Sequence, residues 1–539
     1  MRAIPKKHFL LILVLWAVLF LPHLGELYVN IMEARNFVTA REMLERDNWL
    51  LTTLNGQPRY EKPPLPTWLT AFSGSLFGMQ SLFALRLPAT LATLLMIIYF
   101  WRFLNLLGLK PRQALSAVLI LMTSFYVLFM GRNGQWDIFT HGFMMAAIFY
   151  FTRLVKDKRE GTTDGPLAAV FLGFSILSKG PVSFYALFLP LVLAYGTVFT
   201  YPAVRKKARG LLVWLLMGLA IGSSWFLYVR WADPEAFIEI TSREAGRWTS
   251  YNLRPFYYYW NFFIQSGIWA VPSFLALLYP LLKKQVSERK TYRFSLLWTL
   301  FSVALLTLIP EKKVRYLLPV LIPMALNTSF YIELLFREFR RRPFPEKAVL
   351  YLNHGGIAIV GIGFPLGAFL YFNPVSVWSW FILTSMVLFL LGCAMLYYLW
   401  KTDYPKVFFL TIAFICALVA FGFPLSREIL GNPHFRSFSN LREHMEDLQV
   451  PLYEYDAGAP EIIWDYGTPI PKLEKERLDL PQVKKFGLLV MTKDSLFISK
   501  MQQDYRILSK KRFDLNPVPP GASGYKERLV RNYYLLQKR

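Results

Sequence analysis

A polar stretch between two apolar segments, residues 30–66, holds the densest group of side chains that could do chemistry. Its ionisable residues include Glu33, Arg35, Glu61 and Lys62. Cations stabilise the charge that grows on a departing phosphate, while a carboxylate aligns or deprotonates the attacking group. We therefore predict that residues 26–66 form an active-site loop for transfer of a group from a phosphate.

Further ionisable side chains lie at the ends of later apolar segments. Such residues at membrane edges are functional candidates by default, and cations outside oppose the usual distribution of positive charge. Two pairs among them are one helical turn apart, so each pair could share a helix face. These candidates are Asp137, Lys179, Arg243, Arg247, Lys312 and Tyr316.

Each candidate also has an ordinary structural interpretation. Glu33 follows Asn30 by three residues, a spacing that predicts a capping box at the start of an amphipathic helix. Asp137 could be the N-cap of the next segment, and Lys179 could extend to the interface from a tight turn. Taken alone, Glu33 is better explained as a helix cap, but the convergence of carboxylates and cations on one side of the membrane favours function, and the catalytic candidates are Glu33 and Asp137. The substrate-binding candidates are Arg35, Glu61, Lys62, Lys179, Arg243, Arg247, Lys312 and Tyr316.

The composition indicates a membrane protein. Of 539 residues, 55% are hydrophobic and only 18% are charged, which is too apolar for a soluble enzyme of this length. The net charge of +25 does not indicate nucleic-acid binding, because Lys and Arg form short clusters between apolar runs. Cys393 and Cys416 both lie in apolar runs, so we expect no disulfide framework and no paired-cysteine metal site.

The apolar segments predict about thirteen transmembrane helices. The first is interpreted as an uncleaved span, because no cleavage site follows it. The segment near 65–78 is short and holds two prolines, so we place it at the membrane interface. The predicted spans lie near residues 9–24, 83–106, 113–130, 137–155, 166–178, 181–200, 210–230, 257–282, 294–309, 315–336, 348–372, 376–400 and 405–425.

Basic loops alternate with less basic ones under this count, which predicts a cytoplasmic N-terminus and an outside C-terminus. The loops assigned to the cytoplasm are Lys110 with Arg112, 153–159, 205–209, 283–290, 337–342 and Lys401.

The chain becomes polar after residue 425. Short β-like runs are expected near 452–455, 487–491, 505–509 and 533–537, and helical patterns over 436–448 and 494–502. We therefore divide the chain into a transmembrane domain, 1–425, and a small extracytoplasmic α/β domain, 426–539.

The order of motifs in the first loop resembles membrane glycosyltransferases that use polyprenyl-phosphate sugars, the family of aminoarabinose transferase and the protein mannosyltransferases. The matching motifs are Glu33 with Arg35, Ala40-Arg41-Glu42-Met43, Glu61-Lys62-Pro63, Asp137, Ser178-Lys179-Gly180, Arg247, and Lys312 with Tyr316-Leu317-Leu318-Pro319. The resemblance covers residues 8–425 and implies a GT-C type fold.

Two positions depart from the family pattern. Met32 stands where the family has its main catalytic acid, so the resemblance passes that role to Glu33. The segment Arg243–Arg247 lacks the histidine of the family's E-H-x-x-R motif, which some relatives use for a metal. We therefore predict no metal site and no required cofactor.

The resemblance implies a glycosyltransferase of the bacterial inner membrane that moves a sugar from an undecaprenyl phosphate carrier to an extracytoplasmic acceptor. Lipid A, in lipopolysaccharide, is the first acceptor expected; protein hydroxyls and other envelope glycans are alternatives. A transporter is the alternative from another class, but transporters place charge at mid-membrane, whereas here it lies in loops on one side. An assembly factor, a third class, would tolerate changes at Glu33 and Lys62.

Overall fold

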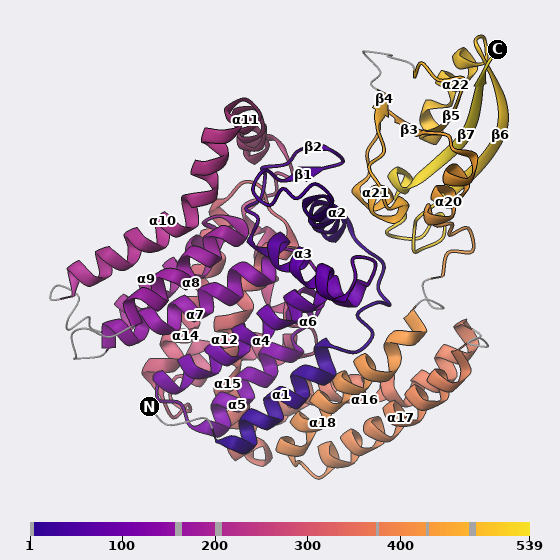
Figure 1. The fold of residues 1–539 in the computed structure, drawn as a ribbon. Coiled ribbons are helices and arrows are strands. Elements are labelled where there is room, and N and C mark those ends of the chain that lie inside the picture. The colour runs from indigo at the N-terminus through magenta and orange to yellow at the C-terminus, as the bar shows by residue number, and fades with distance from the viewer. Residues whose placement is uncertain (1–4, 157–163, 200–206, 373–376, 427–430, 474–480) are drawn as a thin grey trace.

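The computed structural model describes residues 5–156, 164–199, 207–372, 377–426, 431–473 and 481–539. Residues up to 426 form a helical bundle, and the residues from 431 form a sheet with helices beside it (Figure 1). The first part contains, in order, α1 (Lys6–Phe20), α2 (Ile31–Glu45), β1 (Thr53–Leu54), β2 (Gln57–Pro58), α3 (Leu65–Phe77), α4 (Leu82–Leu106), α5 (Pro111–Thr123), α6 (Phe125–Gly131), α7 (Asp137–Lys156), α8 (Asp164–Lys179), η1 (Phe184–Phe188), α9 (Leu189–Val198), α10 (Ala208–Ala232), α11 (Pro234–Ser250), η2 (Phe256–Tyr259), η3 (Phe262–Trp269), α12 (Ala270–Leu277), α13 (Tyr279–Leu282), α14 (Arg289–Leu308), η4 (Val314–Leu317), α15 (Leu318–Glu338), η5 (Phe339–Arg341), α16 (Phe344–Phe372), α17 (Trp378–Trp400), α18 (Tyr404–Ala417), η7 (Leu418–Gly422) and η8 (Phe423–Leu425).

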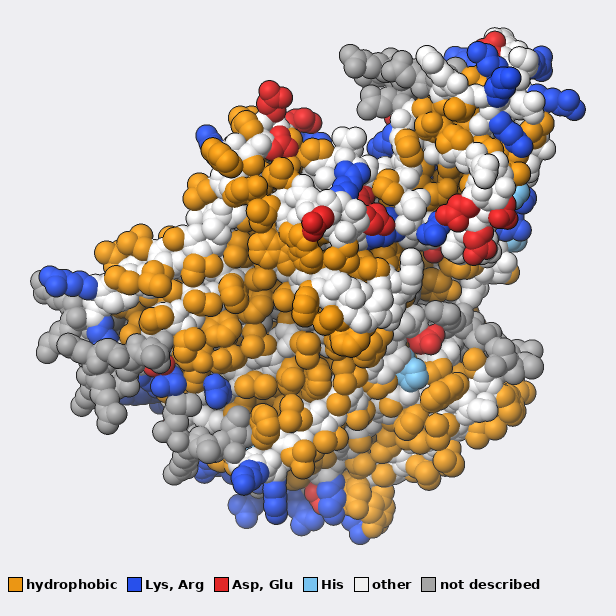
Figure 2. All heavy atoms as spheres, in the orientation of Figure 1, with side chains coloured by type: hydrophobic (Ala, Val, Ile, Leu, Met, Phe, Trp, Pro, Cys, Tyr) orange, Lys and Arg blue, Asp and Glu red, His pale blue; other side chains and the backbone are white. Residues whose placement is uncertain are grey.

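Within the described residues, eight helices are long and apolar enough to cross a membrane. The bent pair of α5 and α6, which meet at 65°, would make a ninth. Figure 2 shows hydrophobic side chains spread over most of this face of the bundle. The prediction of a helical integral membrane protein is confirmed, and the count of thirteen spans stays a prediction.

The remaining predicted spans are short or broken in the structure. Residues 166–178 lie in a 16-residue helix and 184–198 in a 15-residue apolar helix. Residues 257–282 are divided among four short helices, with Gly267 at a φ of 66° inside the break. Pro255 lies just before this stretch, and Pro272 and Pro280 lie within it. A proline has no amide hydrogen to continue a helix, which favours short helices here.

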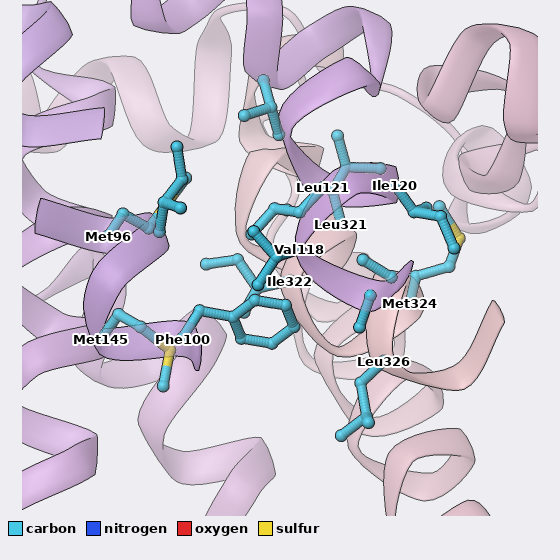
Figure 3. Close-up of a cluster of buried hydrophobic side chains, with 14 of the residues drawn as sticks. Met96, Phe100, Val118, Ile120, Leu121, Met145, Leu321, Ile322, Met324 and Leu326 are labelled. Atoms are coloured by element: carbon cyan, nitrogen blue, oxygen red, sulfur yellow. The ribbon is translucent and has the colours of Figure 1, made fainter. Parts of the chain in front are cut away.

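The core of the bundle surrounds α15, which is buried along its entire apolar length. Side chains of α4, α5, α7 and α15 meet there (Figure 3). α5, α12 and α14 pack against α15 from different sides, so it can be apolar all round. The residues labelled in that view are Met96, Phe100, Val118, Ile120, Leu121, Met145, Leu321, Ile322, Met324 and Leu326.

Small residues let α8 and α10 approach closely. A Cβ atom at Gly173 would lie 2.4 Å from Ile221, and one at Gly222 would lie 2.6 Å from Ile176. Close approach of this kind is the usual basis of helix association in membranes. It fixes α10, and with it the start of α11, against the helix that ends at Lys179.

Basic loops meet at one end of the bundle, the lower edge of Figure 2. Arg112 pairs with Glu333 at 2.6 Å, and Arg340 donates to the carbonyl of Lys401 at 3.4 Å. Arg337 donates to the carbonyl of Gln285 at 3.2 Å. Four of the loops assigned to one side therefore lie together. Others that were assigned there, Lys158, Arg159, Arg205 and Lys206, lie outside the described residues.

The first loop contains α2 and the β1–β2 hairpin and is followed by α3. The predicted capping box is present, since Asn30 and Glu33 bond each other's backbone amides. The hairpin turns at Asn55 and Gly56, both with positive φ. The 13 residues of α3 are too few to cross a bilayer, which needs about 20.

The residues from 431 form a five-stranded sheet in the order β4-β3-β5-β7-β6. β3 pairs in parallel with β4 and β5, and β7 is antiparallel to β5 and β6. The predicted β-like runs and helical patterns all correspond to elements here. These elements are α20 (Ser439–Leu448), β3 (Leu452–Tyr455), α21 (Pro460–Tyr466), β4 (Lys472–Leu473), β5 (Lys485–Val490), η9 (Thr492–Asp494), α22 (Ser495–Met501), β6 (Tyr505–Asp514), η10 (Glu527–Leu529) and β7 (Val530–Lys538). The domain boundary at 425/426 and the side of the membrane stay predictions.

Candidate active site

Glu33 is fully buried at the base of the first loop. Arg86 of α4 donates to its two carboxylate oxygens at 2.7 and 3.0 Å, and the amide of Gly134 donates at 2.9 Å. The amide group of Asn30 donates at 2.9 Å. Both oxygens are therefore engaged, which favours a structural role for Glu33; its catalytic role stays a prediction.

Asp137 and Lys179 form a buried ion pair between the start of α7 and the end of α8. Lys179 binds Oδ1, whereas the buried Oδ2 has no hydrogen-bond partner among the described residues. The two predicted residues are thus brought together, and one carboxylate oxygen is left without a partner in the described part of the chain.

The aromatic ring of Tyr316 lies among three cations. Lys179 Nζ is 5.3 Å from the ring centroid, Arg315 Cζ is 5.8 Å away and Lys313 Nζ is 5.9 Å away. Arg315 also acts on Asp137 and Lys179 through its charge, and its buried Nε has no hydrogen-bond partner among the described residues. Tyr316 therefore supports a cluster of positive charge beside Asp137.

Two further cations, Arg35 in α2 and Lys62 after the β1–β2 hairpin, belong to the same group of positive charges. Burial, together with the charges of Lys179, Arg59 and Arg315, lowers the pKa of Lys62 to about 8 against the opposing charge of Glu244. Burial likewise lowers the pKa of Arg35. Neither side chain forms an ion pair with an acidic residue in the part of the chain described. We call Arg35, Lys62, Lys179 and Arg315 the cation cluster.

α11 carries its charges toward this cluster. Arg243 pairs with Glu61 at 3.4 Å, and Arg247 pairs with Glu244 at 2.5 Å. Both arginines are about half exposed. The charge of Arg247 acts on Arg35, so α11 forms one side of the site.

Lys312, in contrast, serves the backbone. Its Nζ donates to the carbonyls of Arg254 at 3.1 Å and Ile309 at 2.8 Å, and its amide donates to Asn252 at 3.2 Å. Lys312 thereby holds the segment after α11 against the segment that carries Arg315. Its predicted substrate contact stays a prediction.

Sequence reasoning missed three arginines of this region. Arg86 lies inside an apolar helix, Arg59 stacks on Trp136 at 4.8 Å, and Arg315 precedes the predicted Tyr316 by one residue. A buried arginine within an apolar helix requires a partner, and that rule could have pointed from Arg86 to Glu33.

The residues around Glu61 do not fit a metal ion. Oε1 of Glu61 pairs with the guanidinium of Arg243 at 3.4 Å, and its buried Oε2 has no hydrogen-bond partner among the described residues. No group of three or more His, Cys, Asp or Glu side chains that could hold a metal occurs among the described residues. We therefore derive no step through a metal.

Comparison with known proteins indicates the class of protein to which this fold is similar. A family model described as dolichyl-phosphate-mannose-protein mannosyltransferase matches residues 61–228. The fold is that of ArnT from Cupriavidus metallidurans, solved bound to undecaprenyl phosphate: the TM-score is 0.66 at 16% identity, covering 98% of this chain and 97% of that one. The architecture is thus of the GT-C type.

Particular relatives are the undecaprenyl phosphate-alpha-4-amino-4-deoxy-L-arabinose arabinosyl transferases. The one from Pectobacterium atrosepticum is 28% identical over 65% of both chains. The one from Serratia proteamaculans is 26% identical over 67% of this chain and 66% of its own. The match thus spans about two thirds of the length of these curated relatives. The resemblance to polyprenyl-phosphate-sugar-dependent membrane glycosyltransferases is confirmed.

Proposed function

We propose that this protein is a glycosyltransferase of the bacterial inner membrane that transfers a sugar from undecaprenyl phosphate to an acceptor outside the cytoplasm. The observation that carries the proposal is the cation cluster, in which Arg35, Lys62 and Arg315 have no acidic partner among the described residues. The names of the relatives support the carrier, and the resemblance to the aminoarabinose transferase branch makes lipid A the first acceptor proposed. A protein hydroxyl is the second acceptor, favoured by the matching mannosyltransferase model.

The reaction breaks the bond between the sugar's anomeric carbon and a phosphate oxygen, which leaves with the electron pair. An acceptor oxygen forms the new bond to that carbon. Arg35, Lys62 and Arg315 would stabilise the phosphate as its charge grows. The free Oδ2 of Asp137 would align or deprotonate an acceptor hydroxyl, or stabilise positive charge at the anomeric carbon.

The two predicted catalytic carboxylates can be separated by one pair of variants. Asp137→Asn should lower the transfer rate by about 100-fold or more even in the fraction that stays folded after Lys179 loses its charged partner, because a positioned acid or base contributes roughly 10²–10⁴-fold. Glu33→Gln should instead lower the melting temperature, because it leaves Arg86 buried without its charged partner, at a cost of about 3 kcal/mol. Transfer and thermal unfolding are measured on the same purified protein.

The opposite result would reassign the chemistry. A stable Glu33→Gln protein without activity, beside an active Asp137→Asn protein, would make Glu33 the catalytic carboxylate. We also propose that no divalent metal is required, so the same assay should proceed in chelator. Masses of lipid A and of envelope proteins, from cells with and without the protein, distinguish the two acceptors.

A further inference from the structure

The Ala40–Met43 motif of α2 lies apart from the cation cluster, and its two charged side chains face different partners. Glu42 accepts hydrogen bonds from Thr53 Oγ1 at 2.5 Å and from the amide of Gly56 at 3.2 Å. Both donors belong to the β1–β2 hairpin. Glu42, which is buried, therefore holds the hairpin against α2.

Arg41 holds the sheet region instead. Its guanidinium donates to the carbonyl of Ile463 at 3.2 Å and lies 5.8 Å from the ring centroid of Trp464. Phe37, one turn earlier, packs edge-on against the same tryptophan at 5.3 Å. α2 is thus joined to the C-terminal turn of α21, where the carbonyl of Ile463 also accepts from the amide of Gly467.

The tip of the hairpin makes a second attachment. Asn55 donates to the carbonyl of Ile470 at 2.8 Å and accepts from the amide of Ile470 at 2.7 Å. Through Glu42, this hairpin is fixed to the same helix that carries Arg41. The segment 463–470 is therefore held at one end by Arg41 and at the other by Asn55.

The helix that Arg41 holds, α21, also places a negative charge near the site. Glu461, in the first turn of α21, is buried and pairs with Arg528 at 2.8 and 2.5 Å. The charge of Glu461, after that of Glu61, opposes the lowering of the Arg35 pKa by burial. Arg528 leaves about 36% of its side chain exposed. Figure 1 shows α21 beside α2, between the bundle and the sheet.

We propose that Arg41, Glu42 and Asn55 form a clamp that positions the sheet region, through α21, as the wall of the site that faces the acceptor. The three clamp residues are positioning residues, because they reach the site only through α21. The acceptor-facing role rests on the proposed function, whereas the clamp rests on the contacts alone.

Asn55→Gly tests the clamp with little backbone disturbance. Asn55 has a φ of 55°, which glycine adopts freely, so the change removes two hydrogen bonds and keeps the turn. Asp47→Gly is the matched control: Asp47 has a φ of 49° in the same loop and is exposed. In the full-length protein, Asn55→Gly should speed amide hydrogen exchange over 460–470 by about tenfold, and Asp47→Gly should not.

Kinetics separates positioning from mere attachment. Asn55→Gly should raise KM for the acceptor severalfold and leave KM for the donor unchanged, since the cation cluster is untouched. Unchanged exchange over 460–470 would overturn the clamp. Faster exchange with an unchanged acceptor KM would overturn the positioning role. Absence of transfer by the unmodified protein would refute the proposed function, while the exchange result would still decide the clamp.

Discussion

At the scale of single residues, Lys62 makes donor binding dependent on pH. Its pKa of about 8 lies below the usual value of a lysine, because the side chain is buried beside other cations. The side chain is therefore charged below pH 8 and becomes neutral as pH rises through that value. A sugar phosphodiester keeps its single negative charge throughout this range, so KM for the donor should rise above pH 8.

The control for this prediction is Lys62→Arg, whose guanidinium stays charged at higher pH. Its donor KM should stay low to a higher pH than that of the unmodified protein. Identical pH profiles for the two proteins would show that the Lys62 ammonium does not bind the phosphate.

Most of the residues that surround the cluster could be predicted from sequence, and the reason is chemical. Asp137, Lys179 and Lys62 stand out because ionisable residues at the ends of apolar segments are functional candidates by default. Which of them remain free could not be predicted, because pairing depends on distances between segments far apart in the chain. Glu33 is bound by Arg86, 53 residues away, whereas Arg315 forms no ion pair with an acidic residue in the described part of the chain.

At the scale of elements, the features that the sequence predicted correctly are those set by residues close together in the chain. The capping box at Asn30, the short helix after the prolines near 64, and the strands of the sheet region all appear where expected. The predicted span 257–282 is broken, because hydropathy records how apolar a segment is and not whether its backbone stays helical. The bend at Ser124 between α5 and α6 has no hydropathy signal either.

At the scale of the molecule, the charge asymmetry predicts its orientation. The loops of Arg112, Arg337, Arg340 and Lys401 lie together at one end of the bundle, and α2 with the sheet region lies at the other (Figures 1 and 2). By the positive-inside rule, a tag after Arg342 should be accessible only from the cytoplasm and a tag after Arg539 only from outside. A cytoplasmic C-terminus would place the cation cluster on the wrong side for an extracytoplasmic acceptor.

The central claim is that the cation cluster binds a lipid-linked phosphate. Binding of undecaprenyl phosphate to the purified full-length protein tests it directly, with Arg315→Ala compared with Arg340→Ala, an exposed arginine at the opposite end. Loss of a charged hydrogen-bond partner costs about 1.5–3 kcal/mol, so Arg315→Ala should weaken binding at least tenfold while Arg340→Ala binds normally. A folded Arg315→Ala protein that binds the lipid as tightly as the unmodified chain would contradict the account.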